Sequence, residues 1–94
     1  MISEIRRKTK GLVGSFIRTR RETLGMSRAE LTEIIGCSPN LVGMIERGKT
    51  QFPFGRWKIY ADALGVPRHE FLQIAVTERY PECLPYLRFV EACE

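Results

Sequence analysis

Cysteine and histidine are scarce in this sequence, and their scarcity limits the chemistry that the chain can support. It has three cysteines without CxxC spacing and one histidine, His69. Structural zinc sites use four closely spaced ligands of these types, so we expect no metal and interpret the cysteines as reduced thiols. His69 has no matching nucleophile or acid, and the glycines form neither GxGxxG nor a phosphate-binding loop. We therefore expect no cofactor and no enzymatic activity.

Long apolar runs and strand patterns are also missing. No run approaches the roughly 18 apolar residues of a membrane span, and the opening "MISEIRRKTK" lacks the apolar core of a secretory signal. Sustained period-two alternation and Asn-Gly or Asp-Gly turns, which predict hairpins, do not occur. With 94 residues, 44% hydrophobic and 28% charged, the chain should fold as one small all-α domain. We expect a cytoplasmic protein that is not attached to a membrane.

The net charge of +4 is distributed unevenly along the chain. Residues 1–68 hold 13 Lys/Arg against 6 Asp/Glu, whereas residues 69–94 hold 2 against 5. A basic body with an acidic tail favours a body that faces a polyanion. Charge alone leaves open the alternative of a solvated surface with accidental clustering.

Apolar residues recur at helical spacing in five segments, and the segment ends carry local helix signals. Ser27 and Glu30 form an S-x-x-E capping box, and Ser38 precedes Pro39 at the first turn of the next helix. The late stretch "PYLRFVEAC" is compatible with one last short helix. We predict a compact five-helix domain with a short C-terminal helical extension, its main helices lying roughly at 12–24, 27–36, 38–48, 53–64 and 67–80.

A charged residue interrupts the apolar stripe of the first predicted helix. Arg21 lies between Ile17 and Leu24 on that stripe. An unpaired buried guanidinium is very unfavourable, so a carboxylate should face it. Glu46 borders the buried face of the third predicted helix. We predict an ion pair between Arg21 and Glu46.

The third predicted helix has an unusual outer face. At 100° per residue, its apolar positions point to one side, and a second set falls within an arc of about 140° on the other: Pro39, Asn40, Gly43, Met44 and Arg47. That face holds no acid. It offers a small centre for close approach, an amide suited to an adenine edge and an apolar group suited to a thymine methyl. We interpret it as a surface for a DNA groove; the alternative is packing of Gly43 and Met44 on another helix or subunit.

The stretch "MSRAELTEIIGCSPNLVGMIERGKT", followed by "KIYADALGVPRHEFL", resembles the lambda-repressor-like (XRE/Cro-type) helix-turn-helix family of bacterial and phage regulators. The resemblance covers about residues 12–75 and includes Ser27, Glu30, Leu31, Gly36, Ser38, Ile45, Glu46, Gly48 and Lys49. It implies a compact five-helix domain in which helix 27–35 crosses the DNA backbone and helix 38–47 enters the major groove. It also suggests the Arg21–Glu46 pair.

The resemblance implies which residues meet DNA. Base readers map onto helix 38–47, and phosphate contacts map onto Arg28, Lys49 and the following loop. The full expected set is Arg28, Ser38, Pro39, Asn40, Gly43, Met44, Arg47, Lys49, Thr50, Gln51 and Arg56. Unlike the family pattern, Asn40 is the only good hydrogen-bonding base reader on the helix, and the loop "TQFPFGRW" is aromatic. We therefore expect modest direct readout, with DNA shape and methyl contacts carrying more of the specificity.

The two ends of the chain are expected to act separately from the domain at 12–80. The basic arm, residues 1–11, resembles arms that wrap DNA through Arg6, Arg7, Lys8 and Lys10; a solubilising terminus is the alternative. The acidic tail, residues 81–94, is too apolar for a solvated segment. It either folds back or forms a homodimer interface, which we favour, through Leu84, Tyr86, Leu87, Phe89 and Val90.

These observations lead to one expected function and one alternative. We expect a nucleoid-associated, sequence-specific double-stranded DNA-binding transcriptional regulator. It would be an autoregulatory repressor that binds a palindromic operator as a homodimer through helix 38–47. The alternative is a protein-interaction module or antitoxin-type regulator. In that case Met44, Phe52 and Phe54, together with the tail, would bind a protein partner.

Overall fold

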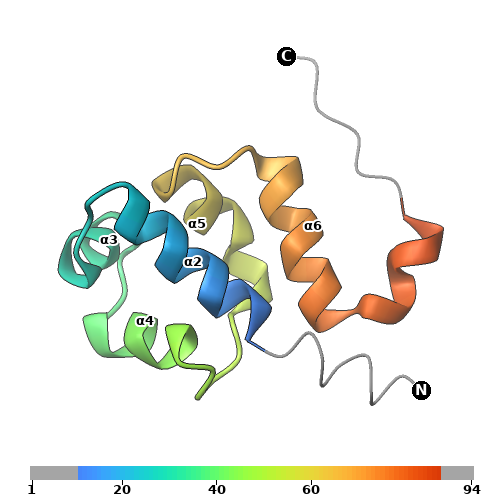
Figure 1. The fold of residues 1–94 in the computed structure, drawn as a ribbon, viewed down its shortest axis with the longest axis horizontal. Coiled ribbons are helices and arrows are strands. Elements are labelled where there is room, and N and C mark those ends of the chain that lie inside the picture. Colours follow the sequence, from blue (N-terminus) through green and yellow to red (C-terminus); the bar gives the residue numbers. More distant parts are fainter. Residues whose placement is uncertain (1–10, 88–94) are drawn as a thin grey trace.

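The computed structural model describes residues 11–87, in which helices joined by turns and loops are the only regular secondary structure (Figure 1). The α-helices are α2 (Leu12–Thr23), α3 (Arg28–Ile35), α4 (Pro39–Glu46), α5 (Trp57–Ala63) and α6 (Arg68–Arg79). Two 3-10 helices, η1 (Phe54–Arg56) and η2 (Pro81–Tyr86), precede α5 and follow α6. The predicted all-α class and five principal helices are confirmed.

Local signals in the sequence set the start and end of the central helices. The Ser27 hydroxyl accepts a hydrogen bond from the Glu30 N–H at 3.0 Å, and the Glu30 carboxylate accepts one from the Ser27 N–H at 2.8 Å. Ser38 caps α4 by accepting from the Leu41 N–H at 3.2 Å. Gly36 ends α3 with φ of 87°, a left-handed conformation that glycine adopts without steric penalty. The predicted capping box and N-cap are therefore present.

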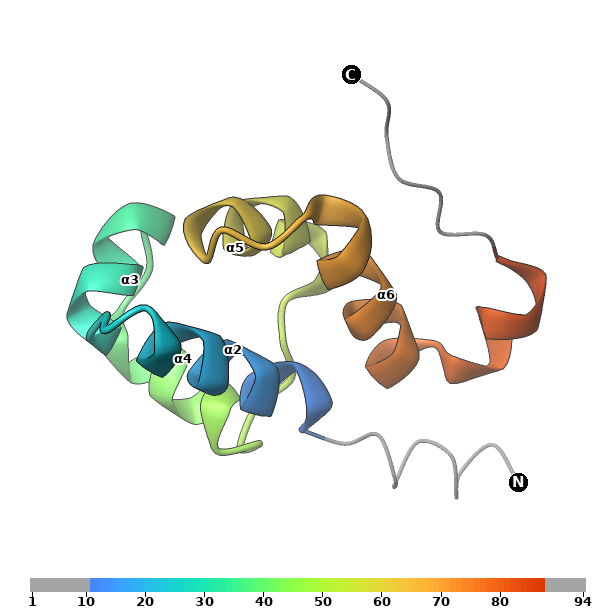
Figure 2. The same ribbon diagram turned by 45° about the horizontal axis from the view of Figure 1, so that its top comes forward.

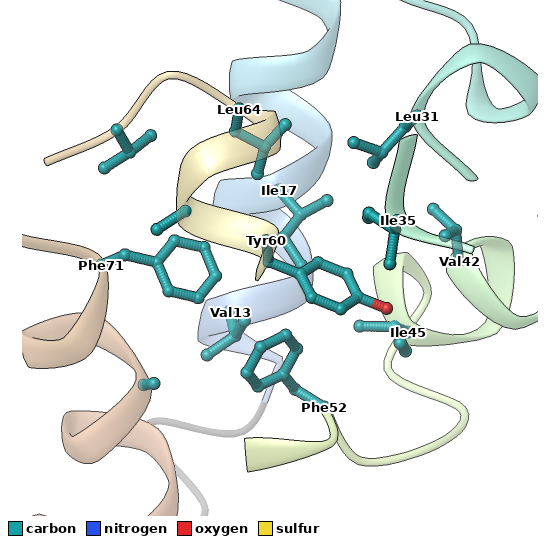
Figure 3. Close-up of a cluster of buried hydrophobic side chains, with 13 residues drawn as sticks. Val13, Ile17, Leu31, Ile35, Val42, Ile45, Phe52, Tyr60, Leu64 and Phe71 are labelled. Carbon is teal, nitrogen blue, oxygen red and sulfur yellow. The ribbon is translucent and has the colours of Figure 1, made fainter. Parts of the chain in front are cut away.

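The helices pack around one apolar core. α2 contacts α4 and α6, while α3 contacts α4 and α5. In Figure 2, α3 lies near one end of α2 and α6 near the other. Tyr60, Phe71 and Ile17 are completely buried at the centre (Figure 3). The rest of the buried apolar set is Val13, Leu31, Ile35, Val42, Ile45, Phe52, Ala61, Leu64, Val66, Ala75 and Val76.

The aromatic loop after α4 belongs partly to this core. The Phe52 ring is buried, with its centroid 4.8 Å from that of Tyr60 and 5.6 Å from that of Phe71. Phe54 is half-buried and meets Tyr80 edge-to-face at 5.5 Å. The alternative in which Phe52 binds a protein partner is therefore wrong, because burying its ring in the core removes that apolar surface from water.

One further expectation differs from the structure. Leu24 was expected on the buried stripe of the first helix, but it is 45% exposed because α2 ends at Thr23 and the chain turns there. The last helix expected within "PYLRFVEAC" falls mostly outside the described residues, and the last described helical segment is η2, Pro81–Tyr86. Proline is tolerated in the first turn of a helix, and Pro81 opens this one.

The described part of the tail is anchored at one end and open at the other. Pro81 is buried, and η2 packs against α6. Tyr86 is 86% exposed and Leu87 is 43% exposed. Among residues 11–87, no helix has the length and apolar character to cross a membrane.

Candidate nucleic-acid interface

One face of helix α4 packs against the domain, and the opposite face is exposed to solvent. Val42 and Ile45 are buried against α2 and α3, and Pro39, Asn40 and Arg47 are exposed on the opposite side. The outward orientation expected for these three residues is therefore observed. It follows from the helical period, since residues three and four positions apart share a face.

The centre of that outer face is not bare, which corrects one expectation. Gly43 is buried because the Arg47 guanidinium lies over it: a Cβ added to Gly43 would be 3.1 Å from Arg47 Nη1 and 3.7 Å from Cζ and Nη2. Met44 is half-buried rather than fully exposed. The long Arg47 side chain extends back over the preceding turn, as side chains on helices do.

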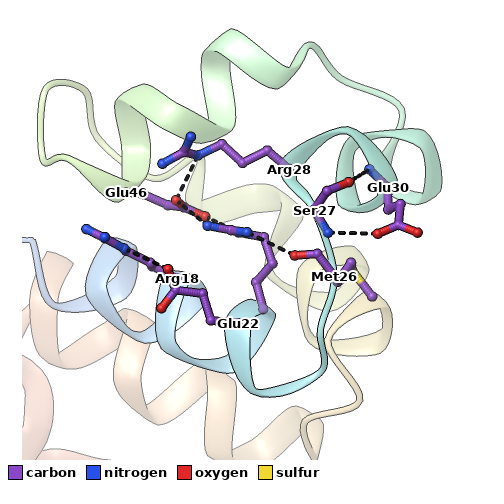
Figure 4. Close-up of polar contacts among 8 residues, drawn as sticks. Arg18, Glu22, Met26, Ser27, Arg28, Glu30 and Glu46 are labelled. Atoms are coloured by element: carbon purple, nitrogen blue, oxygen red, sulfur yellow. Dashed lines mark hydrogen bonds and ion pairs between the residues drawn. The ribbon is translucent and has the colours of Figure 1, made fainter.

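A buried carboxylate joins three helices behind this face. Arg21 Nε donates to Glu46 Oε2 at 2.8 Å and Nη2 donates to Oε1 at 3.1 Å, so the expected Arg21–Glu46 pair is present. Arg28 Nε also donates to Glu46 Oε1, at 3.0 Å (Figure 4). Arg21 Nη1 donates to the Met26 carbonyl at 2.9 Å. The hydrogen bond to Glu46, partly opposed by burial, raises the pKa of Arg21.

The two arginines leave this cluster with a net positive charge. The Glu46 side chain is 1% exposed, so the single acid of α4 presents no negative charge to the outside. Arg28 is 41% exposed at the start of α3. Within residues 11–87 no other hydrogen bond engages its side chain. Its position suits a phosphate contact from a side chain held in one direction by Glu46.

Of the other residues expected to contact DNA, some have exposed side chains and one, Arg56, donates a hydrogen bond within the domain. Lys49 and Gln51 are exposed just after α4, and Thr50 is half-buried. Arg56 is exposed but donates from Nη2 to the Ile35 carbonyl at 2.9 Å, where it satisfies an end of α3. The expected arm residues Arg6, Arg7, Lys8 and Lys10 and the tail residues Phe89 and Val90 lie outside the described residues.

Two contacts that orient α2 were not anticipated from the sequence. Gly14 lies where α2 touches α4, and a Cβ there would overlap with the Ile45 carbonyl. Glu78 of α6 accepts a hydrogen bond from the Val13 N–H at 2.6 Å and so caps α2, whose N-cap Gly11 has no side chain. In the sequence, a glycine next to the apolar Val13 was the only indication of the contact between Gly14 and Ile45. Nothing in the sequence indicated that Glu78 would cap α2.

The described residues also define what the domain can hold. Within residues 11–87, no three His, Cys, Asp or Glu side chains are grouped so that they could bind a metal ion. Cys37 lies between α3 and α4, with Sγ 3.9 Å from the Tyr60 hydroxyl. Burial, followed by the neighbouring Cys37, raises the pKa of the Tyr60 hydroxyl, so this group stays neutral.

Comparison with known families agrees with this geometry. The chain matches the helix-turn-helix domain family over residues 12–73, from the start of α2 into α6. The protein belongs to this family, in its lambda-repressor-like (XRE/Cro) type. Domains of this family are DNA-binding and are typically not enzymes. No curated protein and no solved structure matches the chain.

Proposed function

We propose that the protein is a sequence-specific double-stranded DNA-binding transcriptional regulator that places α4 in the major groove. The observation that carries this proposal is the outer face of α4, where Asn40 and Arg47 are exposed and the only acid of the helix, Glu46, is buried between two arginines. Such a face approaches phosphates without repulsion and presents hydrogen-bonding groups to base edges.

Each exposed group has a chemical role in this arrangement. The Asn40 amide pairs with the edge of an adenine, and the Met44 side chain contacts a thymine methyl. Arg28 and Lys49 bind phosphates on either side of the groove, with Thr50 and Gln51 close to the backbone. The basic arm with Arg6, Arg7, Lys8 and Lys10 adds minor-groove or phosphate contacts.

The regulatory role that we propose is autoregulatory repression by a cytoplasmic homodimer. Two copies would place two α4 helices in successive major grooves, about 34 Å apart, and would therefore select a palindromic operator. The dimer contact would involve Leu84, Tyr86 and Leu87, of which the last two are exposed, together with Phe89 and Val90. Occupation of an operator within its own promoter would block transcription.

Selection of binding sites from random duplex DNA at two salt concentrations tests this proposal. We expect an enriched inverted repeat with half-sites about one helical turn apart, roughly 10 base pairs centre to centre. Affinity should fall as salt rises, with a slope near −0.9 for each phosphate contact. Recovery of unrelated sequences, or of no duplex at low salt, would contradict sequence-specific binding.

The exposed end of the tail supports one second candidate. Tyr86 and Leu87 could bind a protein partner, as in an antitoxin-type regulator, while α4 binds DNA. Large exposed aromatic side chains are enriched at interfaces. Sedimentation of the purified protein separates the two possibilities: a dimer that dissociates when these side chains are made polar favours self-association, and a monomer favours a different partner.

A further inference from the structure

The guanidinium of Arg47 lies about one helical turn away from the position of the Arg47 Cα on α4. Its Cα is at the C-terminal cap of α4, but its guanidinium lies over Gly43, one turn back. Its Nη1, Cζ and Nη2 atoms lie within 3.7 Å of the position that a Cβ on Gly43 would occupy. The missing side chain of Gly43 therefore makes room for the Arg47 cation at the middle of the outer face.

The N–H donors of the Arg47 guanidinium are available to a ligand. Within residues 11–87, the Arg47 side chain has no hydrogen-bond or ion-pair partner, whereas Arg28 is engaged by Glu46 and Arg56 by the Ile35 carbonyl. On the same face, Pro39 and Met44 have no side-chain donor. Asn40 and Arg47 are thus the groups of the α4 face that can donate hydrogen bonds to a base edge.

We infer that Arg47 is a specificity-determining residue that reads a guanine, and that Gly43 is the positioning residue that holds its guanidinium at the centre of α4. The inference rests on the proposed function. The planar fork of arginine matches the O6 and N7 acceptors of guanine, which is the commonest specific contact to DNA. A cation at the end of the helix would meet phosphate instead, so the location over Gly43 decides the role.

The geometry also predicts where the guanine lies within a half-site. Gly43 is three residues from Asn40, roughly 4.5 Å along the helix axis, and base pairs are about 3.4 Å apart. A helix aligned with the groove would therefore place the guanine about one to two base pairs from the adenine that Asn40 reads. Each half-site should contain both.

The test measures base preference in variants that keep the charge. Affinities of the full-length protein are measured for a selected site and for its single base-pair variants, at two salt concentrations. Arg47→Lys keeps the charge but loses the fork, and Gly43→Ala displaces the guanidinium while favouring the helix. Arg18→Lys and Gly55→Ala are the matched controls, because Arg18 is exposed on α2 and a Cβ on Gly55 meets no atom within 4 Å.

We expect the wild-type protein to prefer guanine at one position of each half-site. Arg47→Lys should reduce that preference about tenfold. Gly43→Ala should reduce it by a smaller factor, because its Cβ, 3.1 Å from Arg47 Nη1, moves the guanidinium only slightly. Other positions and the controls should be unchanged. If Arg47→Lys keeps the full preference, the planar fork of Arg47 does not read the guanine and the inference is overturned. A uniform loss of affinity in Gly43→Ala would overturn it too, because Gly43 would then serve close approach to DNA.

Failure of the proposed function gives a different result. If the wild-type protein shows no sequence preference on duplex DNA, both the function and this inference are overturned. If the wild type is selective but lacks the guanine position that depends on Arg47, only the inference fails. Thermal melting of each variant shows that its effect on binding does not come from unfolding.

Discussion

Gly14 of α2 lies directly against the Ile45 carbonyl of α4, with no room for a side chain between the two backbones. This contact sets how closely α4, whose outer face is the proposed DNA-binding surface, approaches α2. The backbones must separate if any other residue replaces Gly14, and interiors of this density resist such shifts.

Gly14→Ala should therefore destabilise the fold. Inserting a methyl group at a filled contact costs about 1–3 kcal/mol, which corresponds to a decrease in melting temperature of roughly 4–8 °C per kcal/mol for a domain of this size. Gly55→Ala is the control, since a Cβ there is unobstructed. Equal melting temperatures for the two variants would contradict the close contact.

The carboxylate of Glu46, shared by Arg21 and Arg28, predicts unequal effects of replacing Glu46 and of replacing its buried partner Arg21. Glu46→Gln leaves Arg21 buried without a charge partner and should cost about 3–5 kcal/mol of unfolding free energy. Arg21→Met should cost less, about 1.5–3 kcal/mol, because Glu46 keeps Arg28. Urea unfolding at neutral pH measures both values. A larger loss in Arg21→Met than in Glu46→Gln would show that Arg28 does not compensate.

The buried Tyr60 hydroxyl predicts a loss of stability in alkali. Its pKa is raised in the fold, so the unfolded chain releases this proton first, from about pH 10 upward. The stabilisation is complete below pH 10 and is lost as pH rises further, by up to about 1.4 kcal/mol per pH unit. Urea unfolding at pH 8 and near pH 11 should show a smaller decrease for Tyr60→Phe than for wild type.

The matched control for this experiment is Tyr86→Phe. Tyr86 is 86% exposed, so its removal should leave the alkaline decrease as in the wild type. If Tyr60→Phe and Tyr86→Phe lose stability equally between the two pH values, the buried hydroxyl is not the cause.

Charge reversal at the end of α4 should strongly weaken DNA binding. Arg47→Glu with Lys49→Glu removes two cations from the proposed interface and adds two anions, so affinity should fall on the order of a hundredfold in about 0.1 M salt. Arg18→Glu with Lys58→Glu makes the same change in net charge on α2 and α5. Similar losses in both pairs, measured by fluorescence anisotropy, would indicate a diffuse charge effect.

The exposed end of the tail should control self-association. Tyr86→Ser with Leu87→Ser removes apolar surface that the described fold does not bury, so dimerisation should weaken at least about tenfold while the melting temperature of the domain is kept. Ile34→Ser, at an exposed position on α3, is the control. Analytical ultracentrifugation measures the dimer, and an unchanged dimer would exclude these two side chains.

Much of α3 and α4 could be predicted because their signals act within one or two turns. Ser27, Glu30 and Ser38 cap helices through neighbouring N–H groups, and the helical period alone turns Asn40 and Arg47 outward. The Arg21–Glu46 pair was predictable for a different reason. A cation on a buried stripe requires a partner, and the third helix offered one at its border.

Other features could not be predicted, because the periodicity of a sequence indicates which face of a helix a residue occupies but not where its side chain ends. Gly43 was expected to offer a small centre for close approach, but the Arg47 side chain covers it. Phe52 lies in a loop without periodicity, so no pattern indicated that its ring enters the core. Arg28 was expected only at phosphate, and its bond to Glu46 appears once α3 and α4 are packed.

By itself the sequence determined the helical segments, their caps and the outward face of α4, because each depends on residues close together in the chain. Only the tertiary structure decided that Gly14 meets Ile45, that Glu78 caps α2 and that one carboxylate holds two arginines. Those contacts join distant segments, and their geometry exists only after the helices have packed around the shared core.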